Sequence, residues 1–331
     1  MSRKKAIYLL GSEHFQGIYG DEEQTRIAGL VDIVAPPQTA ESIRENPSVL
    51  RDVEIILSGW GMADVDDAFI RSAPKLKAIF YAAGSVKDFA GRALDAGILV
   101  TSAYAANGIP VAEYCVANII MGLKQFLPQT RQAHTRRIWN RAPRIPGAYR
   151  STVGLVSLGM VGRHVLHLLR SYDVRIIVYC ITMNDQRAGE LGVRNGSLQE
   201  VFAVSDVVSI HTALTPETVG MITGKHIAAM KEGATLINTS RGAVIREPEM
   251  VEVLRRRPDL TAVLDVTDPE PPAQDSPLYQ LENVFLTPHI AGSTGPECGR
   301  MGSYAVKELE NYLAGKPPIH GVTREMLRTM A

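Results

Sequence analysis

The chain has 331 residues, of which 45% are hydrophobic, a length and composition typical of a packed protein with roughly two domains. Its 35 Lys and Arg balance its 35 Asp and Glu, so charge gives no reason to expect a nucleic acid or an anionic membrane as a partner. The three cysteines form no CxxC pair, and the apolar runs are too short for a signal peptide or a membrane span. These features predict a cytoplasmic protein that binds a small molecule.

Residues 6–101 alternate short apolar strands with helical or loop segments. We predict strands at residues 6–10, 32–35, 53–57, 76–81 and 98–101, with helices at 40–45 and 66–72 between some of them. Such alternation predicts a parallel α/β sheet. Small residues follow two of these strands, in Ser58-Gly59-Trp60-Gly61 and Ala82-Ala83-Gly84-Ser85, where backbone amides could approach a ligand. Taken alone, this composition favours ordinary tight turns.

A long buried helix is predicted to begin near Pro110, because proline suits a first helical turn and apolar residues follow it at helical spacing. We expect this helix to end by Pro128. Residues 133–151 are rich in arginine and aperiodic, which predicts a connecting loop whose basic side chains face solvent.

Residues 152–180 have the strand, turn, helix, strand order of a dinucleotide-binding unit. The turn reads Ser157-Leu158-Gly159-Met160-Val161-Gly162. Gly159 would let the backbone approach a pyrophosphate, and Gly162 would let the helix and strand pack closely. Because Ser157 stands at the first glycine of the fingerprint, the motif alone is weak, and an ordinary turn competes with it.

The rest of the chain continues the alternation. Strands are predicted at 207–211, 234–238, 260–264 and 284–286, helices at 197–204, 225–231, 248–256 and 298–313, and a capping box at Ser197 and Glu200. Counted from Val153, this makes six strands. Gly315 and the prolines after it stop the last helix.

Arg241, Glu270 and His289 each lie just past the end of one of the last three strands. Ligands of open parallel sheets bind beyond the carboxyl ends of the strands, so these three loops should converge. A guanidinium, a carboxylate and an imidazole together make a plausible acid/base site. Each residue taken singly favours a structural role. No cluster of His, Cys and Asp has metal-ligand spacing, so we predict no metal.

Six motifs occur in order along the chain: AYAANGIPVAEY, VGLVSLGMVG, HTALTPETVGMI, LINTSRGAVI, AVLDVTDPEP and LTPHIAGST. Through them the sequence resembles the D-isomer-specific 2-hydroxyacid dehydrogenases over nearly its whole length. The resemblance implies a Rossmann cofactor domain, residues 106–297, inserted into a flavodoxin-like substrate domain made of residues 1–105 and 298–331. It also implies a homodimer built mainly through the cofactor domain.

The function implied is an NAD(P)-dependent oxidoreductase that interconverts a 2-keto acid and a D-2-hydroxy acid by hydride transfer. By motif, Arg241 resembles the arginine that binds the substrate carboxylate and keto oxygen, His289 the acid/base, and Glu270 its partner. The amides of Ala83, Gly84 and Ser85 match the loop that holds the substrate carboxylate. The implied cofactor contacts are Gly159, Met160, Val161, Gly162, Cys180, Thr212, Thr239, Ser240, Asp265 and Gly292. The side chain of His211 is interpreted as structural.

Two positions at the expected cofactor and substrate sites depart from the family pattern. Cys180 stands where NAD-selective relatives carry an acidic residue, and a thiol neither grips a ribose diol nor repels a 2′-phosphate. Arg187 lies too far along the chain to be assigned to a phosphate, so the sequence favours NAD and leaves NADP open. Val86 replaces an aspartate found in many relatives.

Three other functions compete with this one. A dinucleotide-sensing binding protein, similar to the corepressors of this fold, is the main alternative, because such proteins can retain the arginine, glutamate and histidine. Formate dehydrogenases usually carry glutamine in place of Glu270. A regulated phosphoglycerate dehydrogenase is disfavoured because the chain stops soon after the helix at 298–313.

Overall fold

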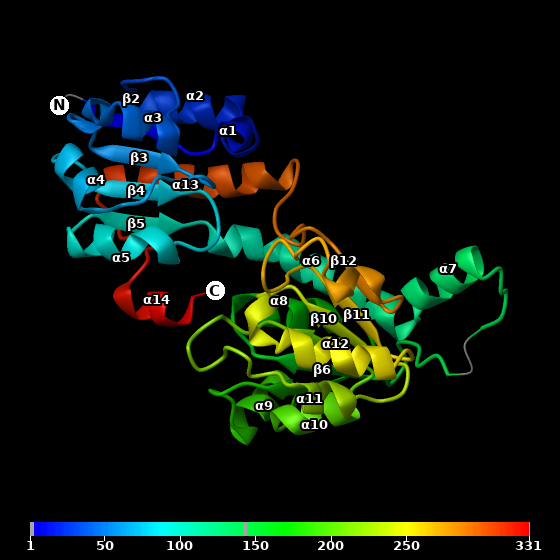
Figure 1. The fold of residues 1–331 in the computed structure, drawn as a ribbon. Helices are drawn as coiled ribbons and strands as arrows, with labels where there is room; N and C mark the ends of the chain where they lie inside the picture. Colours follow the sequence, from blue (N-terminus) through cyan, green and yellow to red (C-terminus); the bar gives the residue numbers. More distant parts are fainter. Residues whose placement is uncertain (1–2, 142–143, 331) are drawn as a thin grey trace. The chain divides into compact units, whose positions relative to one another are not determined.

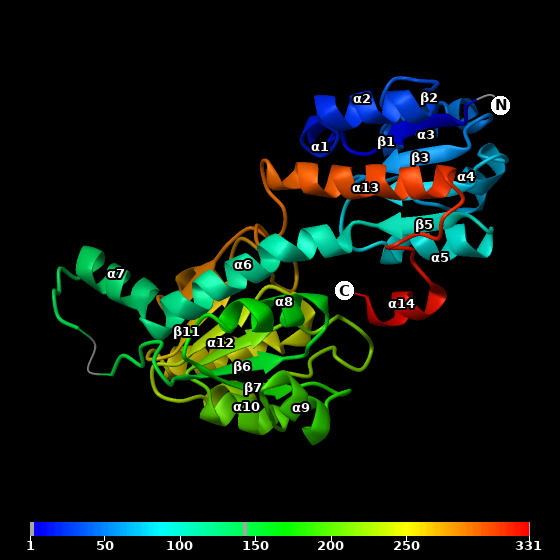
Figure 2. The ribbon, with the colours of Figure 1, turned by 180° about the vertical axis from the view of Figure 1, so that it is seen from behind.

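The computed structural model describes residues 3–141 and 144–330, and the chain divides into two units. The first unit consists of Met1–Gly108 and Ser293–Met330, and the second of Ile109–Gly292. Each is built around one parallel sheet with helices packed against it (Figure 1 and Figure 2). The predicted fold class, α/β with two parallel sheets, is confirmed.

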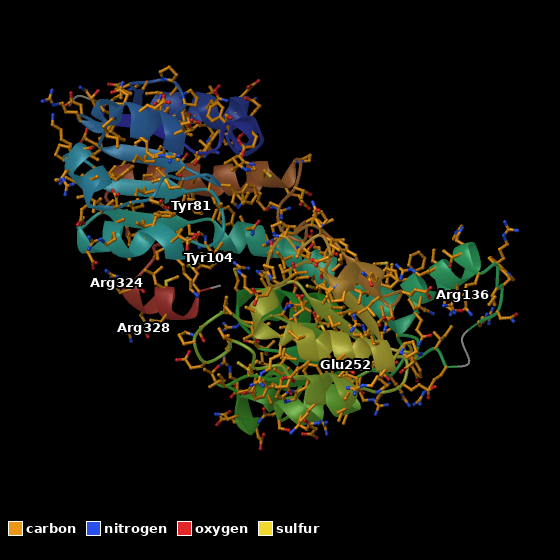
Figure 3. The ribbon with its side chains drawn as sticks, viewed as in Figure 1. Tyr81, Tyr104, Arg136, Glu252, Arg324 and Arg328 are labelled. Carbon is orange, nitrogen blue, oxygen red and sulfur yellow. The ribbon has the colours of Figure 1, made fainter. Side chains whose placement is uncertain are left out.

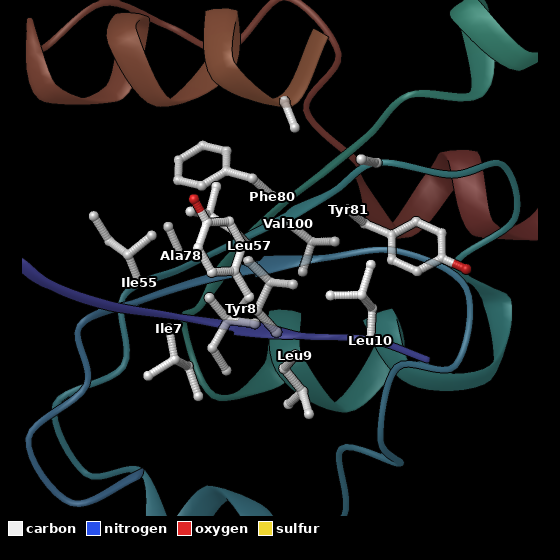
Figure 4. Packing of buried hydrophobic residues seen from close by; sticks show 14 of the residues in the cluster. Ile7, Tyr8, Leu9, Leu10, Ile55, Leu57, Ala78, Phe80, Tyr81 and Val100 are labelled. Atoms are coloured by element: carbon white, nitrogen blue, oxygen red, sulfur yellow. The ribbon is translucent and has the colours of Figure 1, made fainter. Parts of the chain in front are cut away.

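The sheet of the first unit has the order β2-β1-β3-β4-β5, which is that of flavodoxin-like folds. Its strands are β1 (Lys5–Leu9), β2 (Asp32–Ile33), β3 (Ile55–Ser58), β4 (Ala78–Tyr81) and β5 (Leu99–Ser102). Every residue of β3 and β4 is buried, because a parallel sheet covered on both faces needs apolar side chains on both. Figure 4 shows side chains of β1, β3 and β4 packed on the two faces.

Helices cover both faces of this sheet. One face carries α1 (Ser12–Ile18), α2 (Asp21–Leu30) and α13 (Glu297–Leu313) (Figure 2). The other carries α3 (Ala40–Glu45), α4 (Asp67–Ser72) and α5 (Lys87–Asp95), with the short helix η1 (Pro47–Leu50) beside α4 and with α14 (Arg324–Thr329) against α5 (Figure 1). Phe80 of β4 contacts Tyr312 of α13, with ring centroids 5.8 Å apart. The last long helix therefore belongs to the core of the first unit.

The chain after α13 covers the β5 edge of the sheet. Glu308 is 3% exposed and accepts hydrogen bonds from the backbone N–H groups of Ile319 (3.1 Å) and His320 (2.6 Å). Two residues farther on, the Val322 N–H donates to the carbonyl of Val100 at 2.8 Å. A buried carboxylate thus fixes this segment, which then pairs with β5.

The sheet of the second unit has seven strands in the order β12-β11-β10-β9-β6-β7-β8. They are β6 (Thr152–Val156), β7 (Arg175–Tyr179), β8 (Arg194–Asn195), β9 (Val207–Ile210), β10 (Thr235–Asn238), β11 (Thr261–Leu264) and β12 (Val284–Leu286). This is the order of a dinucleotide-binding sheet with one further strand. The chain order reverses between β9 and β6, which is where such sheets bind their ligands.

The helices of the second unit lie on both sides of its sheet. They are α6 (Tyr104–Leu123), which begins in the first unit, α7 (Phe126–Thr135), α8 (Met160–Leu169), α9 (Asp185–Leu191), α10 (Leu198–Val204), α11 (Gly224–Ala228) and α12 (Glu247–Arg256), with the short helices η2 (Gly242–Val244) and η3 (Pro277–Gln280). α7 projects away from the sheet of its unit in both views (Figure 1 and Figure 2).

Two prolines lie within helices. α6 begins at Tyr104, so Pro110 lies inside the helix instead of at its start. An interior proline removes one backbone hydrogen bond, and the complete burial of Ala112 and Cys115 offsets that loss. α6 ends at Leu123, before Pro128 as predicted. Pro128 is the third residue of the next helix, α7, in a first turn that tolerates proline.

The sequence prediction misses the helices α1, α2, α5, α7, α9 and α14, the short helices η1, η2 and η3, and the strand β8. The second sheet therefore has seven strands instead of six. The predicted capping box is half formed: Ser197 accepts the Glu200 N–H at 3.2 Å, but the Glu200 carboxylate pairs with Arg194 at 2.9 Å. The loop predicted at 133–151 begins after Thr135, and its residues 142 and 143 lie outside the described residues.

Candidate active site

Asn238, at the end of β10, shapes the turn that carries Arg241. Its side-chain oxygen accepts hydrogen bonds from the Ser240 N–H (3.0 Å) and hydroxyl (2.9 Å), and its amide nitrogen donates to the Arg241 carbonyl at 3.0 Å. The Arg241 guanidinium donates to the Ser240 carbonyl at 2.7 Å. Because Asn238 is 1% exposed, this turn is fixed from inside the protein.

Gly242 holds the Arg241 turn against the loop that follows β11. A Cβ atom at this position would lie 2.0 Å from the carbonyl carbon and oxygen of Thr267. No side chain fits there, so backbone packs directly on backbone. Thr267 is three residues before Glu270, and the loops of Arg241 and Glu270 are therefore in contact.

Asp265, the residue after β11, connects this loop to the one that follows β12. One carboxylate oxygen accepts hydrogen bonds from the Thr287 hydroxyl (2.7 Å) and the Ile290 N–H (2.8 Å), and the other accepts the Ala291 N–H (2.9 Å). Its carbonyl accepts the His289 N–H at 3.0 Å. Asp265 is 2% exposed, so a buried carboxylate anchors the loop of His289 from both sides.

His289 and Glu270 are in direct contact. The Nδ1 atom of His289 lies 2.5 Å from Oε1 of Glu270. This contact orients the imidazole and leaves Nε2 for proton exchange with a ligand. His289 has a φ of +53°, a left-handed conformation that is uncommon for residues other than glycine. Such backbone strain persists where the surrounding structure determines it, as the Asp265 network does here.

The residues singled out in the first unit follow β4. The Ser102 hydroxyl donates to the carbonyls of Ala83 (3.0 Å) and Gly84 (2.5 Å), which fixes the orientation of this turn. Val86 is the N-cap of α5 and is 1% exposed. Its apolar side chain belongs to the core of the first unit, which gives a physical reason for the departure from aspartate.

The turn after β6 has the form of a phosphate-binding turn. Gly159 is the N-cap of α8, and a Cβ there would meet nothing within 4 Å, so the turn is open beside the free amides of Met160 and Val161. A Cβ at Gly162 would lie 2.5 Å from the Ser157 carbonyl oxygen, so the helix packs closely on the turn. Ser157 has a φ of +77° and takes the glycine conformation without being glycine.

His211 follows β9, next to this turn. Both ring nitrogens are shielded from solvent and lack a hydrogen-bond partner among the described residues. Burial lowers the pKa of His211 to about 4, so the ring is neutral at pH 7. Shielded polar atoms are normally paired, so the unpartnered imidazole of His211 is an exception. The open turn at Gly159 fits a bound dinucleotide.

The other expected cofactor contacts follow the strands as well. The Thr212 hydroxyl donates to the Val156 carbonyl at 3.3 Å, and the Thr239 hydroxyl lies 3.1 Å from the sulfur of Cys115. Cys180 directly follows β7, and Gly292 is the last residue of the second unit. Among the described residues, no group of three or more His, Cys, Asp or Glu could hold a metal ion. Nor does any helix in residues 3–141 or 144–330 have the length and apolar character needed to cross a membrane.

Curated proteins similar to this chain include enzymes named D-3-phosphoglycerate dehydrogenase. D-3-phosphoglycerate dehydrogenase of Archaeoglobus fulgidus is 31% identical over 255 residues, which are 76% of this chain and 48% of the relative. The enzyme of the same name from Methanocaldococcus jannaschii is 30% identical over 287 residues, 86% of this chain and 53% of the relative. The chain thus spans about half the length of these curated relatives.

Solved structures share the fold over nearly the whole chain. The TT0316 protein of Thermus thermophilus has a TM-score of 0.75 at 26% identity and covers 96% of this chain and 100% of its own. The holo form of Rhodotorula graminis D-mandelate dehydrogenase has a TM-score of 0.81 at 20% identity, covering 98% and 99%, a likeness of fold alone. Residues 116–291 match the model described as D-isomer specific 2-hydroxyacid dehydrogenase, NAD binding domain. The chain belongs to the D-isomer specific 2-hydroxyacid dehydrogenase family, and its second unit contains the NAD-binding domain of that family.

Proposed function

We propose that this protein interconverts a small 2-keto acid and the corresponding D-2-hydroxy acid with a nicotinamide dinucleotide. The observation that carries the proposal is the 2.5 Å contact between His289 and Glu270 at the carboxyl edge of an NAD-binding sheet. An acid/base oriented by a carboxylate is what a reaction at a CH–OH carbon requires. Family membership supplies the reaction class.

The dinucleotide, when bound, exchanges a hydride with C2 of the substrate. The residues that would hold it are Gly159, Met160, Val161, Gly162, Cys180, Thr212, Thr239, Ser240, Asp265 and Gly292. The open turn at Gly159 supports this assignment.

His289 is the proton donor and acceptor in this proposal. In the reducing direction, its Nε2 gives a proton to the forming alkoxide oxygen, and Glu270 stabilises the charged imidazole through Nδ1. In the oxidising direction, the same nitrogen takes the proton from the hydroxyl. Arg241 clamps the carboxylate and keto oxygen of the substrate through its planar fork. The backbone N–H groups of Ala83, Gly84 and Ser85 are the proposed second set of hydrogen-bond donors to the substrate carboxylate.

The decisive experiment is a panel of 2-keto acids assayed with NADH and NADPH, on the wild type and on His289→Asn. Asparagine tolerates the left-handed backbone of this position, and loss of a general acid typically lowers the rate by about 10² to 10⁴. We expect that loss in kcat with dinucleotide affinity changed by only a few-fold. His167→Asn, on the exposed side of α8, is the matched control.

Near-normal turnover by His289→Asn would remove the acid/base assignment. Dinucleotide binding by the wild type without turnover of any acid in the panel would instead favour a dinucleotide-sensing protein of the same fold.

We further propose that the protein works in the cytoplasm as a homodimer joined through its second unit. The support is an arm formed by residues 126–141, α7 and the chain after it. No residue of α7 is buried, and Phe126 and Trp139 are 51% and 93% exposed. Arg136, labelled in Figure 3, ends α7 and pairs with Glu282 of the same unit. The arm, which carries these two large exposed apolar side chains, is the proposed dimer contact.

Sedimentation tests the dimer. We expect the wild type to sediment as a dimer at micromolar concentration and Trp139→Ala to dissociate more readily, because it removes the most exposed aromatic side chain of the arm. Tyr279→Ala, which is 57% exposed outside the arm, is the control. A monomeric wild type would refute the proposal.

A further inference from the structure

The end of β7 lacks the carboxylate that would select NAD. In a dinucleotide-binding βαβ unit, the adenosine ribose lies at this strand end, where an acidic residue binds its hydroxyls. Here the strand is followed by Cys180, and residues 181–184 are uncharged. The next residue, Asp185, accepts a hydrogen bond at 2.9 Å from the side chain of Asn195 in β8. Its carboxylate is therefore turned toward the outer edge of the sheet.

The guanidinium of Arg187, a residue of α9, lies near this strand end. The Arg187 N–H is capped by the Asn184 side chain at 2.8 Å, which fixes Arg187 in the first turn of the helix. From there its Nη1 atom reaches to 3.5 Å from the carbonyl oxygen of Thr182. The Thr182 hydroxyl in turn lies 3.4 Å from the sulfur of Cys180. Arg187 is thus close to Cys180 in space, although seven residues separate them in the chain.

The surroundings of Cys180 favour a negative charge. Burial opposes ionisation of the thiol, yet hydrogen bonds from Thr182 and Leu158 and the charge of Arg187 together hold its pKa below the ordinary value. A second guanidinium is near, because Arg163 donates from Nε to the Leu158 carbonyl at 3.0 Å. Two arginines, a hydroxyl and backbone amides therefore surround the place where NAD-selective proteins put an anion of their own.

We propose that Arg187 and Thr182, with Arg163 beside them, bind the 2′-phosphate of NADP(H), and that this chain binds NADPH more tightly than NADH. An arginine at this strand end accommodates the 2′-phosphate in place of the carboxylate that would repel it. A guanidinium also matches the phosphate geometry through two parallel hydrogen bonds. The inference rests on the dinucleotide site of the family and not on turnover, so binding can confirm or refute it even if the proposed reaction fails.

Titration calorimetry of the full chain with NADPH and NADH is the direct test. We expect the wild type to bind NADPH at least about 10-fold more tightly. Arg187→Ala should weaken NADPH by roughly 10- to 100-fold, the usual effect of losing a hydrogen bond to a charged group, and leave NADH within about 3-fold. Arg170→Ala, an exposed arginine just beyond α8, should change neither affinity.

Adenosine 2′,5′-bisphosphate and adenosine 5′-monophosphate separate the 2′-phosphate from the rest of the cofactor. The bisphosphate should bind more tightly to the wild type and lose this advantage in Arg187→Ala. Cys180→Asp, which restores the carboxylate, should weaken NADPH and the bisphosphate while keeping NADH. Equal or tighter binding of NADH by the wild type overturns the proposal, as does an Arg187→Ala variant that weakens both dinucleotides equally while its thermal unfolding is unchanged.

Discussion

The two units share one architecture but differ in how their turns are made. In the first unit, every described residue with a positive φ is a glycine: Gly61, Gly97, Gly295 and Gly315. In the second unit, residues with side chains also take this conformation: Gln125, Arg137, Arg150, Ser157 and His289. Two of these, Ser157 and His289, follow strands at the candidate site. A strained backbone is kept where a particular side chain is needed at a particular place.

The two units also differ in the groups that the loops after their strands present to a ligand. In the first unit, the turn after β4 is small and presents backbone groups, with its carbonyls held by Ser102. In the second unit, the loops after β10, β11 and β12 carry charged side chains and are joined to one another through Gly242 and Asp265. The charged side chains of the candidate site therefore lie in the second unit, and the following substitutions test that contrast.

Gly242→Ala should have the largest effect. Its Cβ would overlap the Thr267 backbone at 2.0 Å, and because backbone cannot move aside cheaply, we expect a loss of more than about 3 kcal/mol in the free energy of unfolding. Gly159→Ala is the contrasting change, since its Cβ meets nothing within 4 Å. It should unfold like the wild type but bind dinucleotide about 10-fold more weakly, because the added methyl group blocks the approach of a phosphate.

Denaturant titrations and calorimetry on both glycine variants check this pair. A stable Gly242→Ala variant would show that the loops of Arg241 and Glu270 are not held together by this contact. Unchanged dinucleotide affinity in Gly159→Ala would show that the phosphates lie elsewhere.

The second unit should also account for a loss of stability in acid. His211 has a native pKa of about 4 and an unfolded value near 6.5, so the unfolded chain binds the extra proton between these values. Its contribution to stability is complete above pH 6.5 and is lost as the pH falls toward 4. By pH 5 this loss is on the order of 2 kcal/mol.

Replacing the imidazole of His211 should remove this pH-dependent loss of stability. His211→Gln should lose less stability than the wild type between pH 7 and pH 5, measured by denaturant unfolding at each pH. His14→Gln, a partly exposed histidine of the first unit, is the control. If His211→Gln and the wild type lose stability equally, then the imidazole is not held neutral by burial.

The smallest effect on stability is expected when glycine and serine are exchanged at one position of positive φ in each unit. Ser157→Gly relieves a φ of +77° and should stabilise the protein by about 1 kcal/mol. Gly97→Ser, at a φ of +74° with open space around its Cβ, should cost about the same amount in the first unit. Thermal unfolding measures both changes. Shifts of the same sign in the two variants would show that backbone strain does not distinguish the units.

All strands except β8 were predictable, because they contain short apolar runs bounded by glycine, proline or polar residues, as β7 and β12 show. Two of the missing helices lack a periodic apolar face: α1 buries only Ile18, and α2 buries Glu23 beside Ile27. Both pack against α13, which comes far later in the chain. The residues of a helix do not by themselves indicate a contact with an element so far along the chain.

Some features of the candidate site could likewise be predicted from the sequence, and others could not. Arg241, Glu270 and His289 could be singled out because they stand at strand ends within motifs. The packing of Gly242 on Thr267, the three donors to Asp265 and the return of Arg187 to Cys180 could not, because each depends on loops that meet only after folding. The orphaned nitrogens of His211 are likewise visible only once the surrounding atoms have positions.

The segment that Glu308 fixes beside β5 bears on how the protein avoids aggregation. An uncovered edge strand offers free N–H and carbonyl groups to the edges of other molecules. In the first unit, β5 is already paired by the chain around Val322, and the opposite edge strand, β2, has only two residues. In the second unit, the edge strands β8 and β12 have two and three residues. Long strands are thus kept inside both sheets, and crowded copies find little free edge through which to form fibrils.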